Sequence, residues 1–285
     1  MAVNDPRKPV RVLWVHNTPR AGRMFLWDVR DALPEEIAVQ EIQLPLRPSL
    51  KTLPSLIARV KKYARAVDVV HAQFGSLVGL AAAFGTRPFV LTLRGTDFYV
   101  LPSSTLLGRI EARLRQLFTH IGCVRADLVV VMSERMRREI RQWPLLKRKR
   151  VIVMIDPVGE EFVSDARRRE AASFANQGPL NILIGSLTGE NPVKRTWLIE
   201  RAVEICQNVG LPVHLNVVAG LSRSEVKDAI LSSDLMALTS THEGWPNIIK
   251  EGLALGVPFI ATDVSDLREL CGADSLNRIV EADEL

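Results

Sequence analysis

Short runs of consecutive apolar residues recur along the chain, and between them lie longer segments in which apolar positions repeat every three or four residues. The short runs predict buried strands, and the longer segments predict amphipathic helices. In the first part of the chain the predicted strands are residues 10–15, 39–44, 68–71, 89–93, 128–132 and 151–155. The predicted helices between them are residues 24–33, 53–66, 106–123 and 133–142.

The second part of the chain repeats this alternation. Its predicted strands are residues 181–185, 213–219, 235–240 and 258–262, and its predicted helices include residues 195–208 and 224–231. Strands that alternate with helices form parallel sheets covered by helices. Residues 157–177 mix Pro, Gly, Asn and charged runs, as a connection between domains does. We therefore expect an α/β protein with two Rossmann-like domains, residues 1–163 and 164–285.

The composition fits this picture, and the charge distribution adds to it. The chain has 285 residues, of which 47% are apolar and 24% charged, as in ordinary globular proteins. Residues 1–150 carry 26 Lys and Arg against 12 Asp and Glu, a net charge of +14, and the remaining residues carry 11 against 20, a net charge of −9. Such a split predicts two domains with different partners.

The segment of residues 239–262, TSTHEGWPNIIKEGLALGVPFIAT, carries the candidate chemistry. It is a predicted strand, a turn, a helix that Pro246 opens and Gly256 closes, and a second strand. The amides of a helix N-terminus attract anions. Glu243 precedes that N-terminus, and Glu251 follows eight residues later inside the helix. Carboxylates around an anion site suit a diphosphate with hydroxyl groups on both sides, and a nucleotide sugar is such a ligand.

This segment resembles the donor-site signature of the family 4 retaining glycosyltransferases, which is a Glu, Gly-x-Pro-Asn, a second Glu eight positions after the first, and Gly-x-Pro. The matching residues are Glu243, Gly244, Pro246, Asn247, Glu251, Gly256 and Pro258. The resemblance implies the GT-B fold, in which two Rossmann-like domains face each other across a cleft. It also implies that Glu243 holds hydroxyls of the donor sugar and Glu251 those of the ribose, while amides near Gly244–Ile248 bind the diphosphate.

A second segment of the same part, Asn191-Pro-Val-Lys194-Arg195, resembles the lysine-containing loop that opens the first helix of the family's donor domain. A lysine that faces Glu243 would neutralise the diphosphate and stabilise it as a leaving group. The resemblance therefore makes Lys194 and Glu243 the catalytic candidates, and an ordinary surface lysine is the alternative for Lys194. It makes Arg195 a second source of positive charge for the donor.

The first part of the chain resembles the family more loosely. Residues 68–75, DVVHAQFG, look like its third-strand motif, and residues 93–97, LRGTD, look like a strand-end motif that is usually His-Gly-x-Asp. The resemblance implies that His71, Arg94 and Asp97 bind substrate, with Arg94 adding positive charge beside the diphosphate. It also implies that Gly22, in the first strand–helix loop, lies near the acceptor and the diphosphate. An ordinary surface pair of Arg94 and Asp97 and a plain tight turn at Gly22 are the alternatives.

The implied reaction is transfer of a sugar from a nucleotide-sugar donor to an acceptor hydroxyl with retention of anomeric configuration, of the hexosyltransferase type (EC 2.4). The expected acceptor is a cell-surface glycan, a glycolipid, a lipid-linked sugar or a polysaccharide precursor. No cofactor and no metal are expected, since side chains and a helix N-terminus supply the positive field and no Asp-x-Asp motif occurs. The chain also has no Gly-x-Gly-x-x-Gly turn, which argues against a nicotinamide or flavin enzyme.

The basic half as a whole indicates a role at an anionic membrane surface, through residues 56–65, 110–116 and 136–150. For any single helix, an ordinary solvated face is the alternative. Nucleic acid is not an expected partner, because no recognised binding motif accompanies the charge. No apolar run approaches 18 residues and no secretory signal precedes the first strand, so we expect a cytoplasmic protein, peripheral at the inner face of the membrane.

Family members usually continue with further helices, the last of which crosses back to the first domain. The sequence stops with residues 278–285, where those helices would begin, so we expect the closing helices to be missing. The alternative function is accordingly a non-catalytic subunit that binds a nucleotide sugar or acts as a scaffold, or an inactive fragment. A phosphorylase or an epimerase on the same fold fits less well, because neither a pyridoxal-phosphate lysine context nor an acid/base pair is evident.

Overall fold

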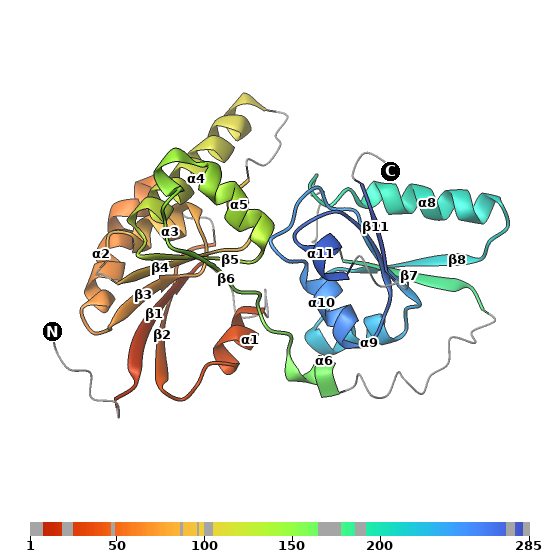
Figure 1. Ribbon diagram of the computed structural model, residues 1–285, viewed down its shortest axis with the longest axis horizontal. Helices are drawn as coiled ribbons and strands as arrows, with labels where there is room; N and C mark the ends of the chain where they lie inside the picture. Colours follow the sequence, from red (N-terminus) through yellow and green to blue (C-terminus); the bar gives the residue numbers. More distant parts are fainter. Residues whose placement is uncertain are drawn as a thin grey trace. The chain divides into compact units, whose positions relative to one another are not determined.

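The computed structural model describes residues 8–18, 25–46, 49–85, 88–95, 97–99, 105–164, 178–185, 192–271 and 277–281. The chain divides into two compact units, residues 1–157 and 158–285. Each unit contains one parallel β-sheet with helices packed against it (Figure 1), as the alternating pattern predicts. None of the described helices combines the length and the apolar character needed to span a bilayer.

The described residues of the first unit form a six-stranded sheet in the order β2-β1-β3-β4-β5-β6, with every neighbouring pair parallel. Its strands are β1 (Val10–His16), β2 (Ile37–Gln43), β3 (Val69–Ala72), β4 (Phe89–Leu93), β5 (Leu128–Val131) and β6 (Val151–Val153). Its helices are α1 (Phe25–Asp31), α2 (Leu53–Ala64), α3 (Ser76–Ala82), α4 (Leu106–Arg125) and α5 (Glu134–Gln142), with the 3₁₀ turns η1 (Leu50–Thr52) and η2 (Pro144–Leu146). The chain reverses its direction across the sheet between β1 and β3.

Helix α4 is anchored through its C-terminal half. Gly122 of α4 faces Gly79 of α3, and a Cβ atom at Gly122 would lie 3.6 Å from the backbone carbon of Gly79 and 3.1 Å from a methyl group of Leu91. The side chains of α4 that are buried are small: Ala112, Thr119 and Cys123. The two helices therefore approach closely on the sheet, and α2 packs beside α3 in the same layer (Figure 1).

The described residues of the second unit form a five-stranded parallel sheet in the order β11-β10-β9-β7-β8. Its strands are β7 (Leu180–Gly185), β8 (Val213–Val218), β9 (Leu235–Leu238), β10 (Phe259–Thr262) and β11 (Arg278–Val280). Its helices are α6 (Glu160–Ser164), α8 (Thr196–Asn208), α9 (Arg223–Leu231), α10 (Asn247–Ala254) and α11 (Leu267–Cys271). From β7 the chain goes to β8 on one side and then returns to β9 on the other, so the direction reverses between β7 and β9.

A core of large apolar side chains holds α10 between α6, α9 and the sheet of the second unit. Phe162 of α6, Met236 of β9 and Phe259 of β10 are all fully buried in it. Because Phe162 belongs to this core, the structure divides after Pro157, whereas the sequence analysis places the boundary at residue 163, inside α6.

Several short elements were not predicted from the sequence: α3, α6, α11, β11 and the two 3₁₀ turns. The helix of the candidate segment also begins one residue later than predicted. Pro246 is the N-cap residue of α10 with an extended ψ of 112°, and the first helical residue is Asn247. Gly256 does follow the end of α10, with a φ of +72° that glycine adopts without strain.

Candidate functional site

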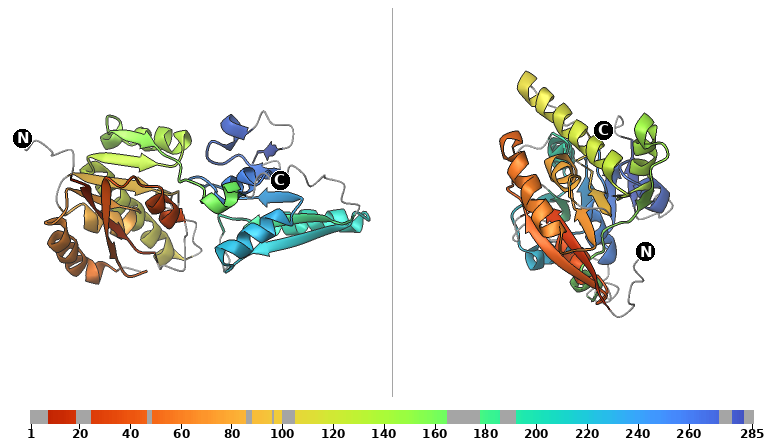
Figure 2. Two further views of the ribbon diagram at one scale, coloured as in Figure 1. Left: turned by 90° about the horizontal axis from the view of Figure 1, so that it is seen from below. Right: turned by 90° about the vertical axis from the view of Figure 1, so that its left-hand side faces the viewer.

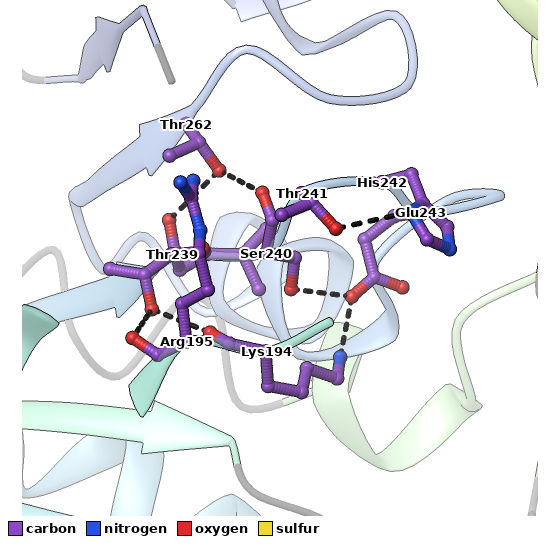
Figure 3. Close-up of polar contacts among 9 residues, drawn as sticks. Lys194, Arg195, Thr239, Ser240, Thr241, His242, Glu243 and Thr262 are labelled. Carbon is purple, nitrogen blue, oxygen red and sulfur yellow. Dashed lines mark hydrogen bonds and ion pairs between the residues drawn. The ribbon is translucent and has the colours of Figure 1, made fainter. Parts of the chain in front are cut away.

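The candidate site of the second unit lies between β7 and β9, where the chain reverses its direction across the sheet. Lys194 and Arg195 follow β7 and precede α8, while residues 239–243 follow the neighbouring strand β9. Both segments therefore lie at the carboxyl edge of the sheet, at the position where open α/β sheets bind ligands. The sequence analysis named residues from both segments, and the structure brings them together (Figure 3).

The two catalytic candidates form an ion pair. Nζ of Lys194 donates to Oε1 of Glu243 at 2.5 Å, and both side chains are about four-fifths buried, with 19% and 17% of their surface exposed. The hydroxyl of Ser240 donates to the same carboxylate oxygen at 2.7 Å. Glu243 is thus fixed by two donors on one oxygen (Figure 3), while a carboxylate offers acceptor positions on its other oxygen as well.

Thr239 joins the two loops. Its hydroxyl donates to the backbone carbonyl of Lys194 at 2.7 Å, and its own carbonyl accepts from Nε of Arg195 at 2.9 Å. The amide of Thr241 adds a 2.8 Å bond to the carbonyl of Val193. These reciprocal bonds hold the lysine loop against the β9 loop, so the position of Lys194 depends on residues from both.

Arg195 has a backbone conformation that an arginine seldom adopts. Its φ of 45° and ψ of 43° are left-handed, a region in which residues other than glycine are strained. The bond from its guanidinium to Thr239 offsets part of this cost. Strain of this kind persists where the surrounding structure over-determines it, and it gathers at functional sites.

A second layer of hydroxyl groups supports the glutamate loop. Thr262, the last residue of β10, donates its hydroxyl to the carbonyl of Ser240 at 2.6 Å, and Ser265 donates to the carbonyl of Gly244 at 2.6 Å. Ser240, Thr262 and Ser265 are all buried. Sequence reasoning missed these positioning residues and Thr239, although three of the four lie inside the segment of residues 239–262.

Helix α10 starts directly beside this ion pair. Gly244 and Pro246 make the turn between Glu243 and the helix, and Asn247 and Ile248 are its first two residues. A Cβ atom at Gly185 would lie 3.4 Å from a methyl group of Ile248, so the end of β7 packs against the start of α10. Glu251 is partly exposed in the next turn of the helix.

His242, beside Glu243, was not named from the sequence. Its Nδ1 lies 3.1 Å from the hydroxyl of Thr241. Burial lowers the pKa of His242 below its usual value, against the opposing effect of Glu243. The imidazole is therefore neutral at physiological pH and adds no positive charge to that of Lys194.

The predicted residues of the first unit form a separate cluster at the carboxyl edge of its own sheet. Arg94 pairs with Asp156 in a buried ion pair, and its Nη2 donates to Oε1 of Gln73 at 2.9 Å. Its guanidinium also lies over the ring of Phe25, 4.8 Å from the centroid. The charge of Arg94 is thus balanced by Asp156, a partner that sequence reasoning missed because the two residues are 62 positions apart.

The structure describes two of the three other predicted residues of this unit, Asp97 and His71. The carboxylate of Asp97 accepts from the backbone amide of Arg94 at 3.1 Å and so shapes the turn after β4. Nε2 of His71 lies 2.7 Å from the hydroxyl of Thr92, and burial, together with the charge of Arg94, lowers the pKa of His71 to about 3. Gly22 lies outside the described residues.

No group of three His, Cys, Asp or Glu side chains gathers within the described ranges as the ligands of a metal ion would. The absence of a metal from the chemistry stays a prediction. The roles that the sequence analysis gives to the individual site residues also stay predictions, which the geometry makes testable.

Comparison with solved structures concerns the fold. Sucrose-phosphate synthase from Thermosynechococcus elongatus matches with a TM-score of 0.61 and 15% identity, over 97% of this chain and 86% of that one. Anabaena HepE, in a complex with UDP and glucose, matches with a TM-score of 0.61 and 16% identity, over 95% and 86%. At these identities the likeness shows the fold alone, and it confirms the predicted GT-B fold with its two α/β units.

Comparison with protein sequences concerns the family. The chain is 26% identical over 253 residues to a protein of Bacillus subtilis (strain 168) provisionally named teichuronic acid biosynthesis glycosyltransferase TuaC, and the match covers 79% of this chain and 61% of that protein. The family model for glycosyl transferases group 1 matches residues 198–283. The model for Glycosyltransferase Family 4 matches residues 10–154, half of the chain. The chain therefore belongs to glycosyltransferase family 4.

Proposed function

We propose that this protein is a retaining glycosyltransferase that moves a sugar from a nucleotide-sugar donor to an acceptor hydroxyl. The observation that carries the proposal is the Lys194–Glu243 ion pair. It is held beside the N-terminus of α10, between β7 and β9, where the chain reverses its direction across the sheet. A cation and a set of helix amides lie there within reach of a diphosphate, and a carboxylate lies within reach of sugar hydroxyls.

Each group of the site has a part in this proposal. Lys194 and the amides near Gly244–Ile248 bind the diphosphate, with Arg195 as a further source of charge. Glu243 orients the hydroxyls of the donor sugar, and Glu251 binds those of the ribose. A carboxylate that accepts two hydroxyl groups fixes a sugar in one orientation, and fixed orientation of the reacting groups lowers the barrier to transfer.

In the proposed chemical step, bonds form and break only between atoms of the donor and the acceptor. The bond from the anomeric carbon to the diphosphate oxygen breaks, and its electron pair leaves with the diphosphate. The acceptor oxygen forms the new bond on the same face, and its proton passes to the departing diphosphate. Lys194 stabilises the charge that develops on the leaving group, which is where a preorganised cation is most effective. We propose that a metal ion is not required.

The basic first unit is the proposed place of the acceptor. The named process of the Bacillus subtilis relative, teichuronic acid biosynthesis, supports a cell-surface glycan, a lipid-linked sugar or a polysaccharide precursor as the acceptor class. The net charge of +14 on residues 1–150 supports a protein that works at an anionic membrane surface.

The test is a transfer assay that follows the product by NMR. The full chain is incubated with UDP-, GDP- and ADP-sugars and with a panel of glycan and lipid-linked acceptors. A new glycosidic bond with the anomeric configuration of the donor is the expected result, and an inverted product would contradict the retaining mechanism. A donor that binds without transfer to any acceptor would instead support a non-catalytic nucleotide-sugar-binding subunit.

A further inference from the structure

Helix α4 exposes several of its large apolar side chains, while three others, Leu114, Phe118 and Ile121, are partly buried. The residues that it buries are Ala112, Thr119, Gly122 and Cys123, all of them small. On the opposite side lie Leu106, Ile110 and Leu117, whose side chains are 67%, 48% and 52% exposed. An ordinary surface helix has its apolar stripe toward the core and its polar residues in water, so the exposed apolar side chains of α4 are an additional face.

The spacing of these residues makes one continuous stripe. Leu106, Ile110, Arg113 and Leu117 follow at intervals of four, three and four residues, which places them on one face of a helix. Leu107, next to Leu106 in the sequence, widens this face and is 80% exposed. We call the face formed by Leu106, Leu107, Arg109, Ile110, Arg113 and Leu117 the α4 stripe.

The first turns of α4 extend beyond the sheet and the other helices of the first unit (Figures 1 and 2). The C-terminal half of the helix is pressed against α3 at Gly79 and Gly122, whereas the first six residues include no buried side chain. Thr105 caps the helix by accepting the amide of Gly108 at 3.1 Å, so the projecting end is a well-formed helix.

The charge on the α4 stripe has one sign. Arg109 and Arg113 are exposed between the leucines. The nearest acidic residue, Glu111, points away by about 100° from Ile110 and pairs with Arg115 at 2.6 Å. The stripe therefore combines aliphatic side chains with arginines, and none of its residues is aromatic or acidic. Helices that lie in a lipid interface combine apolar residues such as leucine with lysine or arginine, and a surface charge of one sign, positive, is complementary to anionic lipid.

We infer that the α4 stripe is the surface through which this protein docks on an anionic lipid bilayer. Leu106, Leu107 and Ile110 enter the boundary between headgroups and acyl chains, while Arg109 and Arg113 bind headgroup phosphates. The positive end of the helix dipole points the same way and adds to the attraction. This inference deepens the proposed membrane contact by naming the element that makes it, and it does not depend on the identity of the donor sugar.

The test is flotation of the full chain with vesicles of phosphatidylcholine alone and of phosphatidylcholine mixed with phosphatidylglycerol. We expect the wild type to float with the anionic vesicles only. The triple variant Leu106→Ser, Leu107→Ser, Ile110→Ser should lose flotation. The double variant Arg109→Gln, Arg113→Gln should bind about 30-fold more weakly, the effect of two basic residues at an anionic surface. All the replaced side chains are exposed, so each variant should melt at the wild-type temperature in circular dichroism.

A matched control removes two charges from another basic helix of the same unit. Lys61 and Lys62 of α2 are exposed, and the double variant Lys61→Gln, Lys62→Gln should float within about twofold of the wild type if the arginines of α4 are the ones that contact lipid. The inference is overturned if the wild type does not float with anionic vesicles or if the triple variant floats like the wild type. An equal loss of vesicle binding in the arginine double variant of α4 and the lysine double variant of α2 would also overturn the inference.

Donor binding separates this inference from the proposed function. Calorimetric titration of the triple variant with a nucleotide sugar should give the wild-type affinity, because α4 belongs to the first unit and the donor site to the second. Flotation that depends on α4 in a protein that binds no donor would contradict the proposed function and leave the lipid contact standing.

Discussion

Nζ of Lys194 lies 2.5 Å from Oε1 of Glu243, although the two residues are 49 positions apart in the sequence. The ion pair forms because β7 and β9 are neighbours in the sheet, so that the loops after the two strands meet at its carboxyl edge. Both residues remain partly accessible. A ligand can therefore reach a cation and a carboxylate that are already held in place. Because these side chains are ordered beforehand, binding loses little of their conformational entropy.

Replacing Lys194 by Met should weaken donor binding while leaving the fold intact. The variant keeps the length of the side chain and removes one charge-assisted hydrogen bond to the diphosphate, which costs about 1.5–3 kcal/mol, a roughly 10- to 150-fold weaker affinity. Calorimetry with the nucleotide sugar measures it. Arg201→Met, on the exposed side of α8, is the matched control and should bind like the wild type. An unchanged affinity in Lys194→Met would remove this residue from the donor site.

Replacing Thr262 by Val should disturb the site from a distance. The change deletes the hydroxyl that donates to the carbonyl of Ser240 and leaves that buried carbonyl short of a donor, at a cost of about 1–3 kcal/mol in unfolding free energy. Because Ser240 also holds Glu243, donor affinity should fall as well. Thr262→Ser keeps the hydroxyl and should restore both quantities. If Thr262→Ser binds donor as weakly as Thr262→Val, the hydroxyl is not what positions the loop.

Two substitutions at Arg195 should separate backbone strain from side-chain bonding. Both Arg195→Gly and Arg195→Ala lose the bond to Thr239, but only glycine relieves the left-handed conformation, so the glycine variant should be the more stable by about 1 kcal/mol. Urea unfolding measures the difference. In the interior of α8 the same pair of changes at Arg201 should have the opposite order, with glycine less stable by about 1 kcal/mol. The same order at both positions would contradict the strain at Arg195.

Replacing Asp156 by Asn should destabilise the first unit strongly. The guanidinium of Arg94 would be left buried without its counter-charge, which typically costs about 3–5 kcal/mol. Denaturant unfolding measures the loss. The pair of Arg11 with Asp68 on the same sheet is exposed, so Asp68→Asn should have only a small effect. Equal, small effects of the two substitutions would mean that the Arg94–Asp156 pair does not support the fold.

Stability should fall as the solution is acidified below pH 6.5. His71 has a folded-state pKa of about 3, lowered from an ordinary value of 6.5, so between these values the unfolded chain binds a proton that the folded protein does not. The contribution of His71 is complete above pH 6.5 and is lost toward pH 3, by up to about 1.4 kcal/mol per pH unit. Denaturant unfolding at a series of pH values should give a shallower slope for His71→Gln. An equal slope would contradict the neutral, buried state of this histidine.

The sheets of both units follow from the sequence because their buried strands are continuous apolar runs, such as the one that forms β5. Helix α3 does not follow from it. Residues 77–83 are all buried, so the segment has no polar face, and its apolar residues do not repeat with the period of an amphipathic helix. The short elements α6, α11 and β11 gain their stability from packing, as Phe162 in α6 shows. Each of them is too short for its sequence to show a helical or strand period.

The charged members of the site could be found from the sequence, and their supports could not. Lys194 and Glu243 stand in motifs whose residues and spacing are specific. Thr239, Ser240 and Thr262 are ordinary hydroxyl residues of strand ends, and only the pairing of β9 with β10 brings Thr262 to the carbonyl of Ser240. Asp156 likewise becomes the partner of Arg94 only once β5 and β6 are placed beside β4.

The central claim, that the second unit holds a nucleotide-sugar donor, is tested most directly by calorimetric titration with UDP-, GDP- and ADP-sugars. The wild type should bind one nucleotide class, and Glu251→Ala should lose that binding. Glu200→Ala, an exposed glutamate on α8 of the same unit, should retain it. A folded wild-type protein that binds none of the three donors, or a Glu251→Ala variant that binds as tightly as the wild type, would contradict the claim.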